Sequence, residues 1–296
     1  MARTAPNEAL APAPGGGLDA VHAPYLRDAP TLSYVEPHDP WLRRTVLSLL
    51  ERSFGRDRLQ ALYRDLKAAG APPEQFFRNA LEAAGIRIDL RGTPLDALPG
   101  SGPLVFIANH PFGITDGLAF CELALRARGD LRILLHAMLC QDRDLARFFL
   151  PIDFTETPRA QITNLRSRQL ALTALADGVP LLIFPAGGVS TRSHFGFGPL
   201  ADLPWSTYAA KLITQSGATV VPCHFHGENS RLFHLASPFS QTLRYALLLH
   251  ETRRRFEHSC TVTIGRPIPA AEIAALSGRR AQTERLHAAT WDLGLG

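Results

Sequence analysis

Short apolar runs that alternate with longer helical segments, from residue 86 onwards, are the feature that most limits the fold. These runs are rich in residues that favour strands, and they span residues 86–90, 104–108, 131–137, 180–185, 219–225 and 260–265. Helical segments are expected between them at about 115–127, 159–177, 205–216 and 239–254. Strands that are apolar along their whole length are buried on both faces. The pattern therefore predicts an α/β fold with a mainly parallel central sheet flanked by helices.

The residues before this pattern divide into two regions. Residues 1–31 are rich in Ala, Pro and Gly, a composition typical of a flexible, disordered tail. Residues 32–85 predict an N-terminal helical region, because apolar residues recur there at helical spacing and are expected to face a core. The expected helices span about 41–55, 57–69 and 73–84. Residues 86–296 are then expected to form one α/β domain.

The charge balance narrows the class of partner. The chain carries 31 Lys and Arg residues against 27 Asp and Glu residues, and all but two of the basic residues are arginines. Guanidinium groups suit phosphate and carboxylate partners, so an anionic membrane surface, an acidic carrier protein, coenzyme A or nucleic acid would fit. An ordinary arginine-rich surface would fit as well. Nucleic-acid binding is not expected, because the chain has neither a basic run nor a recognisable motif.

Three features indicate where the protein works. No stretch approaches 18 consecutive apolar residues, so no transmembrane helix is expected. The N-terminus lacks the apolar segment of a secretory signal. The four cysteines are scattered, which favours reduced thiols over a disulfide framework or a zinc site. We expect a cytoplasmic protein whose membrane contact is peripheral, on the inner face of the cytoplasmic membrane.

The first motif with chemical potential is NHPFGITDG, residues 109–117, which follows directly on an apolar strand. His110 is thus expected just beyond the carboxyl end of that strand, the edge where open α/β sheets bind ligands. Thr115 is a candidate N-cap for the next helix, which places Asp116 in its first turn. Asp116 could then orient the His110 ring and leave the other ring nitrogen free as a base. A buried histidine in a turn is the structural alternative.

A second motif, FPAGGVSTR at residues 184–192, also follows an apolar strand. Gly187 and Gly188 permit a close approach of the backbone to a ligand, and successive N–H groups could form an anion nest. Ser190, Thr191 and Arg192 add donors that suit a phosphate or another polar headgroup. Two such loops at the carboxyl ends of neighbouring strands would form one active site.

The order of these motifs resembles the glycerolipid acyltransferases, which acylate lysophosphatidic acid and related lysolipids. The resemblance rests on Asn109-His110 with Asp116, on Phe184-Pro185-x-Gly187, and on Val220-Val221-Pro222. NHPFGITDGL, FPAGGVSTR and HFHGENSRLFHLAS are more similar still to the bacterial hemolysin-like branch, which includes the lyso-ornithine lipid acyltransferases. The resemblance covers about residues 33–294, including IGRPIP at 264–269.

This resemblance implies an O-acyltransferase of a type that transfers groups other than amino-acyl groups. It would move a fatty acyl group from an acyl carrier protein or coenzyme A thioester to the hydroxyl of a lysolipid, such as lysophosphatidic acid or lyso-ornithine lipid. His110 would be the general base and Asp116 its partner. No cofactor or metal is implied. The residues expected to bind substrate are Asn109, Phe184, Pro185, Gly187, Gly188, Ser190, Arg192, Glu228 and Asn229.

The motifs depart from the family pattern at two points. Five residues separate His110 from Asp116 where four are common, although this longer spacing suits the hemolysin-like branch. Ala186 stands where the family's Phe-Pro-Glu-Gly motif has Glu, and Gly188 stands where the branch often has Glu. These changes leave the acceptor headgroup open.

Other functions than acyl transfer are also compatible with parts of the sequence. The changes at Ala186 and Gly188 would suit a non-catalytic lipid- or acyl-carrier-binding protein on the same fold, whereas His110 and Asp116 argue against it. A serine hydrolase is not expected, because no Gly-x-Ser-x-Gly elbow follows a strand. His224 and the histidine two residues later would lie on one face of a strand as half of a metal site, but no set of further ligands accompanies them.

Overall fold

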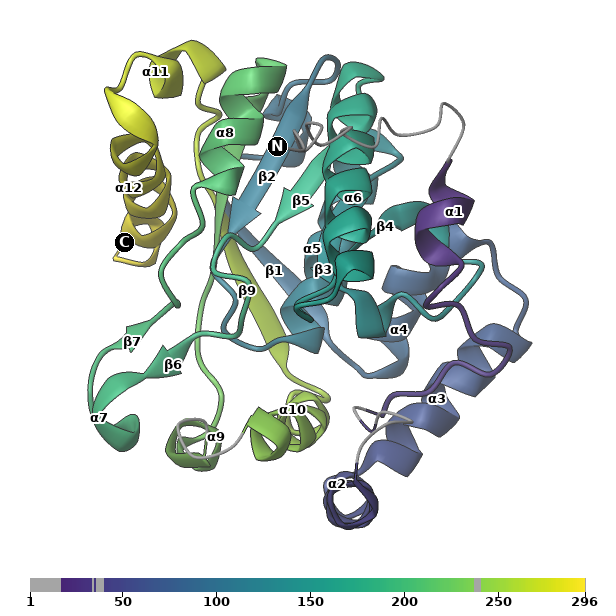
Figure 1. The fold of residues 1–296 in the computed structure, drawn as a ribbon. Coiled ribbons are helices and arrows are strands. Elements are labelled where there is room, and N and C mark those ends of the chain that lie inside the picture. The colour runs from purple at the N-terminus through teal and green to yellow at the C-terminus, as the bar shows by residue number, and fades with distance from the viewer. Residues whose placement is uncertain (1–16, 34, 36–39, 237–240, 296) are drawn as a thin grey trace, which may run out of the picture.

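The computed structural model of the chain describes residues 17–33, 35, 40–236 and 241–295, and it centres on one seven-stranded sheet (Figure 1). The strand order across the sheet is β1-β9-β8-β2-β5-β3-β4. The strands are β1 (Arg87–Gly92), β2 (Leu104–Ala108), β3 (Arg132–His136), β4 (Phe149–Ile152), β5 (Leu181–Ile183), β8 (Thr219–Phe225) and β9 (Ser259–Ile264). From β8 to β4 all neighbours are parallel, whereas β9 is antiparallel to β8 and parallel to β1. The predicted mainly parallel sheet is confirmed.

Helices cover both faces of the sheet (Figure 1). One face packs against α4 (Phe76–Ala83) and α5 (Ile114–Arg128). The other packs against α6 (Pro158–Ala176), α8 (Tyr208–Ser216), α11 (Ala270–Ala274) and α12 (Gly278–Trp291). The 3₁₀ helices are η1 (Pro73–Gln75), η2 (Leu95–Ala97), η3 (Ala137–Leu139), η4 (Ala146–Phe148) and η5 (Asp292–Gly294).

Strand β2 shows why the apolar runs have no polar face. Leu104, Phe106 and Ala108 enter the core beneath α4 and α5. Val105 and Ile107 enter the core beneath α6 and α8. Successive side chains of a strand point to opposite faces, so a strand between two helical layers is apolar at every position.

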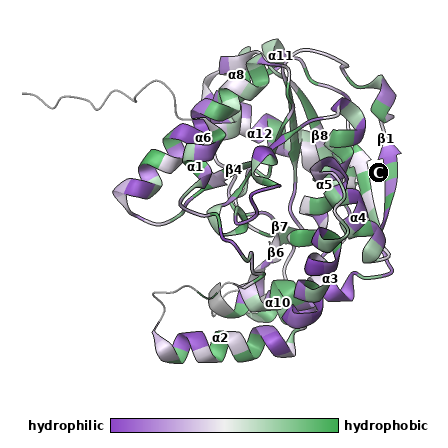
Figure 2. Cartoon of the chain, turned by 90° about the vertical axis from the view of Figure 1, so that its right-hand side faces the viewer, coloured by the Kyte–Doolittle hydropathy of each residue, from purple (hydrophilic) through white to green (hydrophobic). Residues whose placement is uncertain are grey.

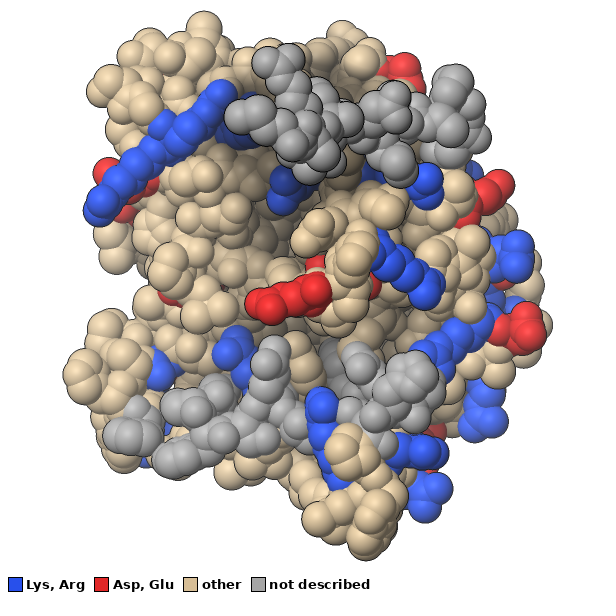
Figure 3. Space-filling view, viewed as in Figure 1, with Lys and Arg blue, Asp and Glu red and all other residues tan. Residues whose placement is uncertain are grey.

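A further group of helices lies at the carboxyl end of the parallel strands (Figure 1). It consists of α2 (Trp41–Ser53), α3 (Arg56–Ala68), α9 (Arg231–Ala236) and α10 (Gln241–Arg254), and α10 packs against the other three. These helices enclose the edge at which His110 lies. Figure 3 shows basic side chains distributed over one face of the molecule, with acidic side chains among them.

The structure differs from the sequence prediction in the N-terminal part. Residues 1–16 lie outside the described residues, but Leu18–His22, inside the expected disordered tail, form helix α1. Val21 and His22 are buried, because α1 packs against α6 and β4. In the part of the chain that the structure describes, no helix combines the length and the apolar composition needed to cross a membrane.

Three strands were not expected. β4 is only four residues long and contains Pro151, which lowers its strand signal, but it pairs with β3 alone and so occupies an edge where proline is tolerated. β6 (Thr191–Arg192) and β7 (Leu200–Ala201) form a separate antiparallel pair that brackets α7 (Ser193–Gly196). Elements of two residues carry too little periodicity to be found by pattern.

Candidate active site

His110 and Asp116 lie side by side beyond the end of β2. Nδ1 of His110 is 3.2 Å from Oδ1 of Asp116. The Asp116 carboxylate is buried, whereas the His110 side chain keeps 18% of its surface exposed. The sheet edge, the short loop and the helix start thus bring together the two residues that were predicted to meet.

The Asp116 carboxylate is held by backbone donors. Its Oδ2 accepts a hydrogen bond from the Phe112 N–H at 2.8 Å, and its Oδ1 accepts one from the Gly117 N–H at 2.9 Å. The first turn of α5 adds the positive end of the helix dipole. The backbone donors hold the carboxylate in a position from which it can orient an imidazole.

Helix α5 begins one residue earlier than predicted. Its N-cap is Gly113, with φ of +87°, a conformation that favours glycine. Thr115 is therefore inside the first turn rather than the N-cap, and its buried hydroxyl has no hydrogen-bond partner among the described residues. A Cβ atom at Gly113 would lie 3.1 Å from Leu248 and 3.3 Å from Val189, so the turn is also closely packed.

The second loop holds the first in place. The Phe184 ring stacks on the His110 ring, with 3.9 Å between centroids and 25° between planes. The Ser190 N–H donates to the His110 carbonyl at 2.8 Å. With Nδ1 beside Asp116, Nε2 is the ring nitrogen left to exchange a proton, and no described residue hydrogen-bonds to it.

His110 opens onto a largely apolar cavity of about 900 Å³. Part of its wall comes from the second loop, through Phe184, Pro185, Gly187 and Gly188. The cavity extends beneath the N-terminal helices, where it is lined by Leu59, Leu62, Leu66, Phe76, Phe77 and Ala80. A cavity of this size and composition suits a ligand with an alkyl chain.

Two residues expected to bind substrate instead brace the loops. The Asn109 amide is buried and bonds both backbone groups of Phe225, through Nδ2 to the carbonyl at 2.9 Å and through Oδ1 to the N–H at 2.7 Å. Ser190 is also buried, and its hydroxyl donates to Asp202 at 2.5 Å. Neither side chain lines the cavity. They join β2 to β8 and the second loop to residue 202, and their contact with substrate stays a prediction.

Arg192 and Glu228 form an ion pair with each other. Nε and Nη2 of Arg192 donate to the two Glu228 oxygens at 2.5 and 2.7 Å, and Nη1 donates to the Gly198 carbonyl at 2.9 Å. The hydrogen bond from Arg192 lowers the pKa of Glu228. Nε2 of His234 lies 3.1 Å from Glu228, while burial lowers the pKa of that histidine. These groups do not line the cavity, and the contact of Arg192 and Glu228 with substrate stays a prediction.

Asn229, the last predicted site residue, is buried and does not line the cavity either. Its amide atoms have no hydrogen-bond partner among the described residues. His224, in β8, and His226, just beyond the end of β8, lie with ring centroids 4.9 Å apart, and burial lowers the pKa of His224 to about 4. Within the described residues, no group of three or more potential ligands could hold a metal ion.

Sequence reasoning missed several polar residues of the cavity wall. Arg168 on α6, Tyr208 on α8 and Arg244 on α10 all line it. The Arg168 guanidinium lies 5.0 Å from the centroid of the Tyr208 ring, and burial raises the pKa of Tyr208 to about 12. Each residue belongs to a helix outside both loops, and no local motif marks it.

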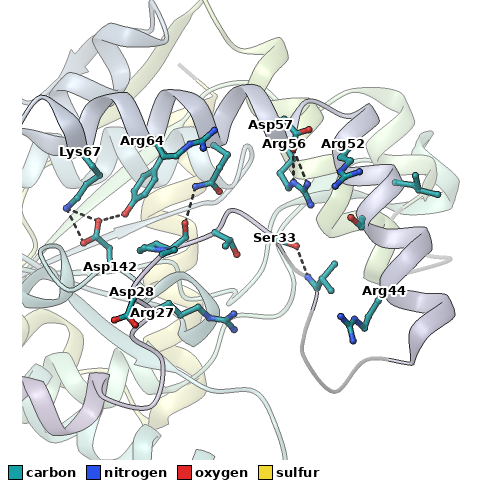
Figure 4. A pocket seen from close by; sticks show the side chains of 18 of the residues that line it. Arg27, Asp28, Ser33, Arg44, Arg52, Arg56, Asp57, Arg64, Lys67 and Asp142 are labelled. Carbon is teal, nitrogen blue, oxygen red and sulfur yellow. Dashed lines mark hydrogen bonds and ion pairs between the residues drawn. The ribbon is translucent and has the colours of Figure 1, made fainter.

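A second cavity, of about 1450 Å³, lies between α2, α3 and residues 27–33, and its wall is strongly basic (Figure 4). Lys67 pairs with Asp142 at 3.1 Å, and Arg56 pairs with Asp57 at 3.0 Å. Among the described residues, the guanidinium groups of Arg27, Arg44, Arg52 and Arg64 have no carboxylate partner. The two cavities share Pro30, Thr31, Tyr63 and Asp142, so they adjoin.

Comparisons with known proteins identify relatives of this chain. A family model described as Acyltransferase matches residues 32–293. The lyso-glycine lipid O-acyltransferases of Phocaeicola vulgatus and Bacteroides thetaiotaomicron are 28% and 27% identical over 239 residues, which is 77% of this chain and 80% and 82% of theirs. The 1-acyl-sn-glycerophosphate (LPA) acyltransferase PlsC of Thermotoga maritima superposes with a TM-score of 0.49 and 16% identity, over 85% of this chain and 95% of its own.

Proposed function

This chain belongs to the acyltransferase family, and we propose that it transfers a fatty acyl group from an acyl thioester to the hydroxyl of a lysolipid, with His110 as the general base. The observation that carries the proposal is the His110–Asp116 pair, with 3.2 Å between Nδ1 and Oδ1, at the wall of a largely apolar cavity. The non-catalytic alternative is set aside, because the curated relatives are O-acyltransferases.

The transfer needs one base and no covalent intermediate on the protein. Nε2 of His110 takes the proton of the acceptor hydroxyl as the oxygen attacks the thioester carbonyl carbon. The C–S bond then breaks, and the departing thiolate receives the proton from the imidazolium. A thioester is already activated, so base catalysis of about 10²–10⁴-fold suffices without a nucleophilic side chain. Asp116 stabilises the imidazolium and fixes the ring.

The cavity accounts for the lipid substrates. Its apolar wall beneath α3 and α4 would hold an acyl chain, and the glycine turn at Gly187, with φ of +65°, lets the backbone approach the reacting groups. We include lyso-glycine lipid among the candidate acceptors because the two curated relatives carry that substrate in their names. Lyso-ornithine lipid and lysophosphatidic acid are the others. Either acyl carrier protein or coenzyme A would carry the donor.

Helix α2 supports a peripheral membrane contact. It lies at the edge of the molecule away from the sheet, and its Trp41 and Leu49 are exposed (Figures 1 and 2). These two side chains line the basic cavity together with Arg44 and Arg52 (Figure 4). Apolar and cationic side chains on one helix suit an anionic lipid surface, where each basic residue contributes about 1 kcal/mol. The adjoining reaction cavity would then receive its lipid from the membrane.

Product analysis tests the transfer. Purified protein is incubated with labelled acyl-carrier-protein and acyl-coenzyme A thioesters and with a panel of the three lysolipids, and the products are identified by mass spectrometry. We expect at least one acceptor to gain an ester-linked acyl chain. A wild-type protein that acylates none of them from either donor would contradict the proposal.

Vesicle co-sedimentation tests the membrane contact separately. The protein should bind vesicles that contain an anionic phospholipid at low salt and should be released at high salt, because screening weakens the attraction. Neutral vesicles are the control, and the double variant Arg44→Gln, Arg52→Gln should lose most of the binding. Binding that is insensitive to salt, to lipid charge and to this variant would refute the contact.

A further inference from the structure

The wall of the cavity that His110 lines contains a cation with no carboxylate partner among the described residues, and we infer that this residue, Arg244, binds an anionic group of the acceptor headgroup. The inference rests on the proposed function and names the recognition chemistry of the same site. The ligand group is a carboxylate or a phosphate.

Arg244 is placed in the wall by its helix. It lies on α10 and lines the same cavity as His110. Its Nη2 donates to the Val189 carbonyl at 2.5 Å, and its guanidinium carbon lies 5.7 Å from the centroid of the Phe233 ring. Burial lowers the pKa of Arg244. No described Asp or Glu forms an ion pair with it.

A half-buried guanidinium without a carboxylate has unused binding capacity. The group carries five N–H donors in a fork that matches carboxylate and phosphate oxygens. One donor is used on Val189, and the cost of removing the charge from water is offset when an anion pairs with it. Arg192 is the contrasting case, because Glu228 and Gly198 already occupy its three nitrogen atoms.

The position of Arg244 relative to the reacting groups follows from backbone contacts. Val189, which accepts its hydrogen bond, precedes Ser190, and the Ser190 N–H donates to the His110 carbonyl. One turn further along α10, Leu248 lies against Gly113 in the first loop. One face of α10 therefore supports both loops and presents the guanidinium to the cavity they share.

Gly188 leaves the space next to this cation open. A Cβ atom built on Gly188 would lie 3.8 Å from Nη2 of Arg244 and 3.0 Å from the Cδ1 end of Leu203. The φ of Gly188 is not positive, so a side chain there is compatible with the backbone if Leu203 shifts slightly. A glutamate at 188 would reach Arg244 and occupy its fork. The absence of a side chain keeps the guanidinium available to a ligand.

Two sources could supply the anion. An amino-acid lipid whose amino group is acylated retains a carboxylate, and a lysophospholipid retains a phosphate, so either acceptor presents the required group. The phosphate of the donor's carrier arm is the other source. We assign the acceptor, because the wall that Arg244 shares with His110 is largely apolar, whereas the arginines without a carboxylate partner among the described residues line the adjoining basic cavity (Figure 4).

The test compares Gly188→Glu with Gly188→Gln, which have the same size and differ in charge. Steady-state rates are measured with N-(3-hydroxymyristoyl)glycine and with its glycinamide, and the acceptor and the donor are varied separately. We expect the Glu variant to raise the acceptor KM about 10- to 100-fold above that of the Gln variant for the carboxylate, with no such difference for the amide. Arg244→Gln should reproduce the loss with the carboxylate acceptor.

Other results overturn the assignment. Equal constants for the Glu and Gln variants with the carboxylate acceptor would leave Arg244 only the role of holding Val189. A change in the donor KM alone would assign the guanidinium to the donor phosphate instead. Isothermal titration calorimetry of the carboxylate compound with wild type and with Gly188→Glu measures binding to the anion subsite independently of turnover. Selective loss of binding without any transfer would sustain the anion subsite and refute the proposed reaction.

Discussion

The loops that follow β2 and β5 look alike in sequence and do different things in the structure. Each follows an apolar strand, contains glycine and carries polar side chains. In the first loop, His110 and Asp116 meet within ion-pair distance at the cavity. In the second, the side chains of Ser190 and Arg192 turn toward Asp202 and Glu228 and leave the cavity wall to other groups.

Polar residues in the sequence of a loop therefore do not show whether their side chains point into the cavity or away from it. The second loop contributes its backbone, its two glycines and the Phe184 ring that stacks on His110. Its hydroxyl and guanidinium stabilise the loop itself. The first loop places its ionisable groups in the site because Asp116 has backbone donors in its own turn and needs no distant partner.

Replacement of His110 by alanine tests the catalytic role proposed for the first loop and should have the largest effect. We expect the transfer rate to fall by about 10²–10⁴-fold, since the variant lacks the base. The fold should persist, because the side chain ends in a cavity rather than in a core. Rates of product formation measure the loss of transfer, and a thermal melt measures whether the fold persists. A folded His110→Ala protein with nearly wild-type rates would remove His110 from the mechanism.

Asp116→Asn should lower kcat by a smaller factor, on the order of 10², because stacking on Phe184 still restrains the His110 ring. The acceptor KM should change little, since Asp116 is buried behind His110. Asp202→Asn, at the partner of Ser190, is the matched control, where an equal loss of charge should leave kcat near wild type. If the two variants lose activity equally, the distinction between the loops disappears.

Ser190→Ala tests the structural role of the polar side chains in the second loop. The variant loses a buried hydrogen bond to the Asp202 carboxylate, so the free energy of unfolding should fall by about 1–3 kcal/mol. Both KM values should stay within about twofold of wild type, because the hydroxyl does not reach the cavity. Chemical denaturation and steady-state kinetics give the two quantities. A raised KM with unchanged stability would restore Ser190 to the binding site.

Arg192→Ala should have the smallest effect. The ion pair with Glu228 is partly exposed, so its loss should lower the free energy of unfolding only slightly, with both KM values unchanged. Arg192 holds the pKa of Glu228 below its ordinary value of 4.5. The pair therefore stabilises the fold above that pH, and its contribution is lost as the pH falls through the lowered pKa. The difference between wild type and variant should vanish in acid. A large rise in either KM would contradict this account.

The sequence by itself determined the elements whose signals are local. Periodicity identified the strands of the sheet except β4, β6 and β7, and the spacing of His110 and Asp116 predicted their encounter, because a strand end, a turn and a helix start lie within seven residues. It also placed Phe184, Gly187 and Gly188 beside them, since parallel strands end at one edge of the sheet.

Only the tertiary structure decided which polar groups pair with each other. Arg192 and Glu228 are 36 residues apart, and Asn109 bonds Phe225 at a separation of 116 residues. The order of the strands and the packing of α10 over both loops bring such groups together, and no local pattern encodes that arrangement. Arg192, which lies in a motif, is thus paired with Glu228, whereas Arg244, which lies in no motif, lines the cavity and is the arginine that we propose for the ligand.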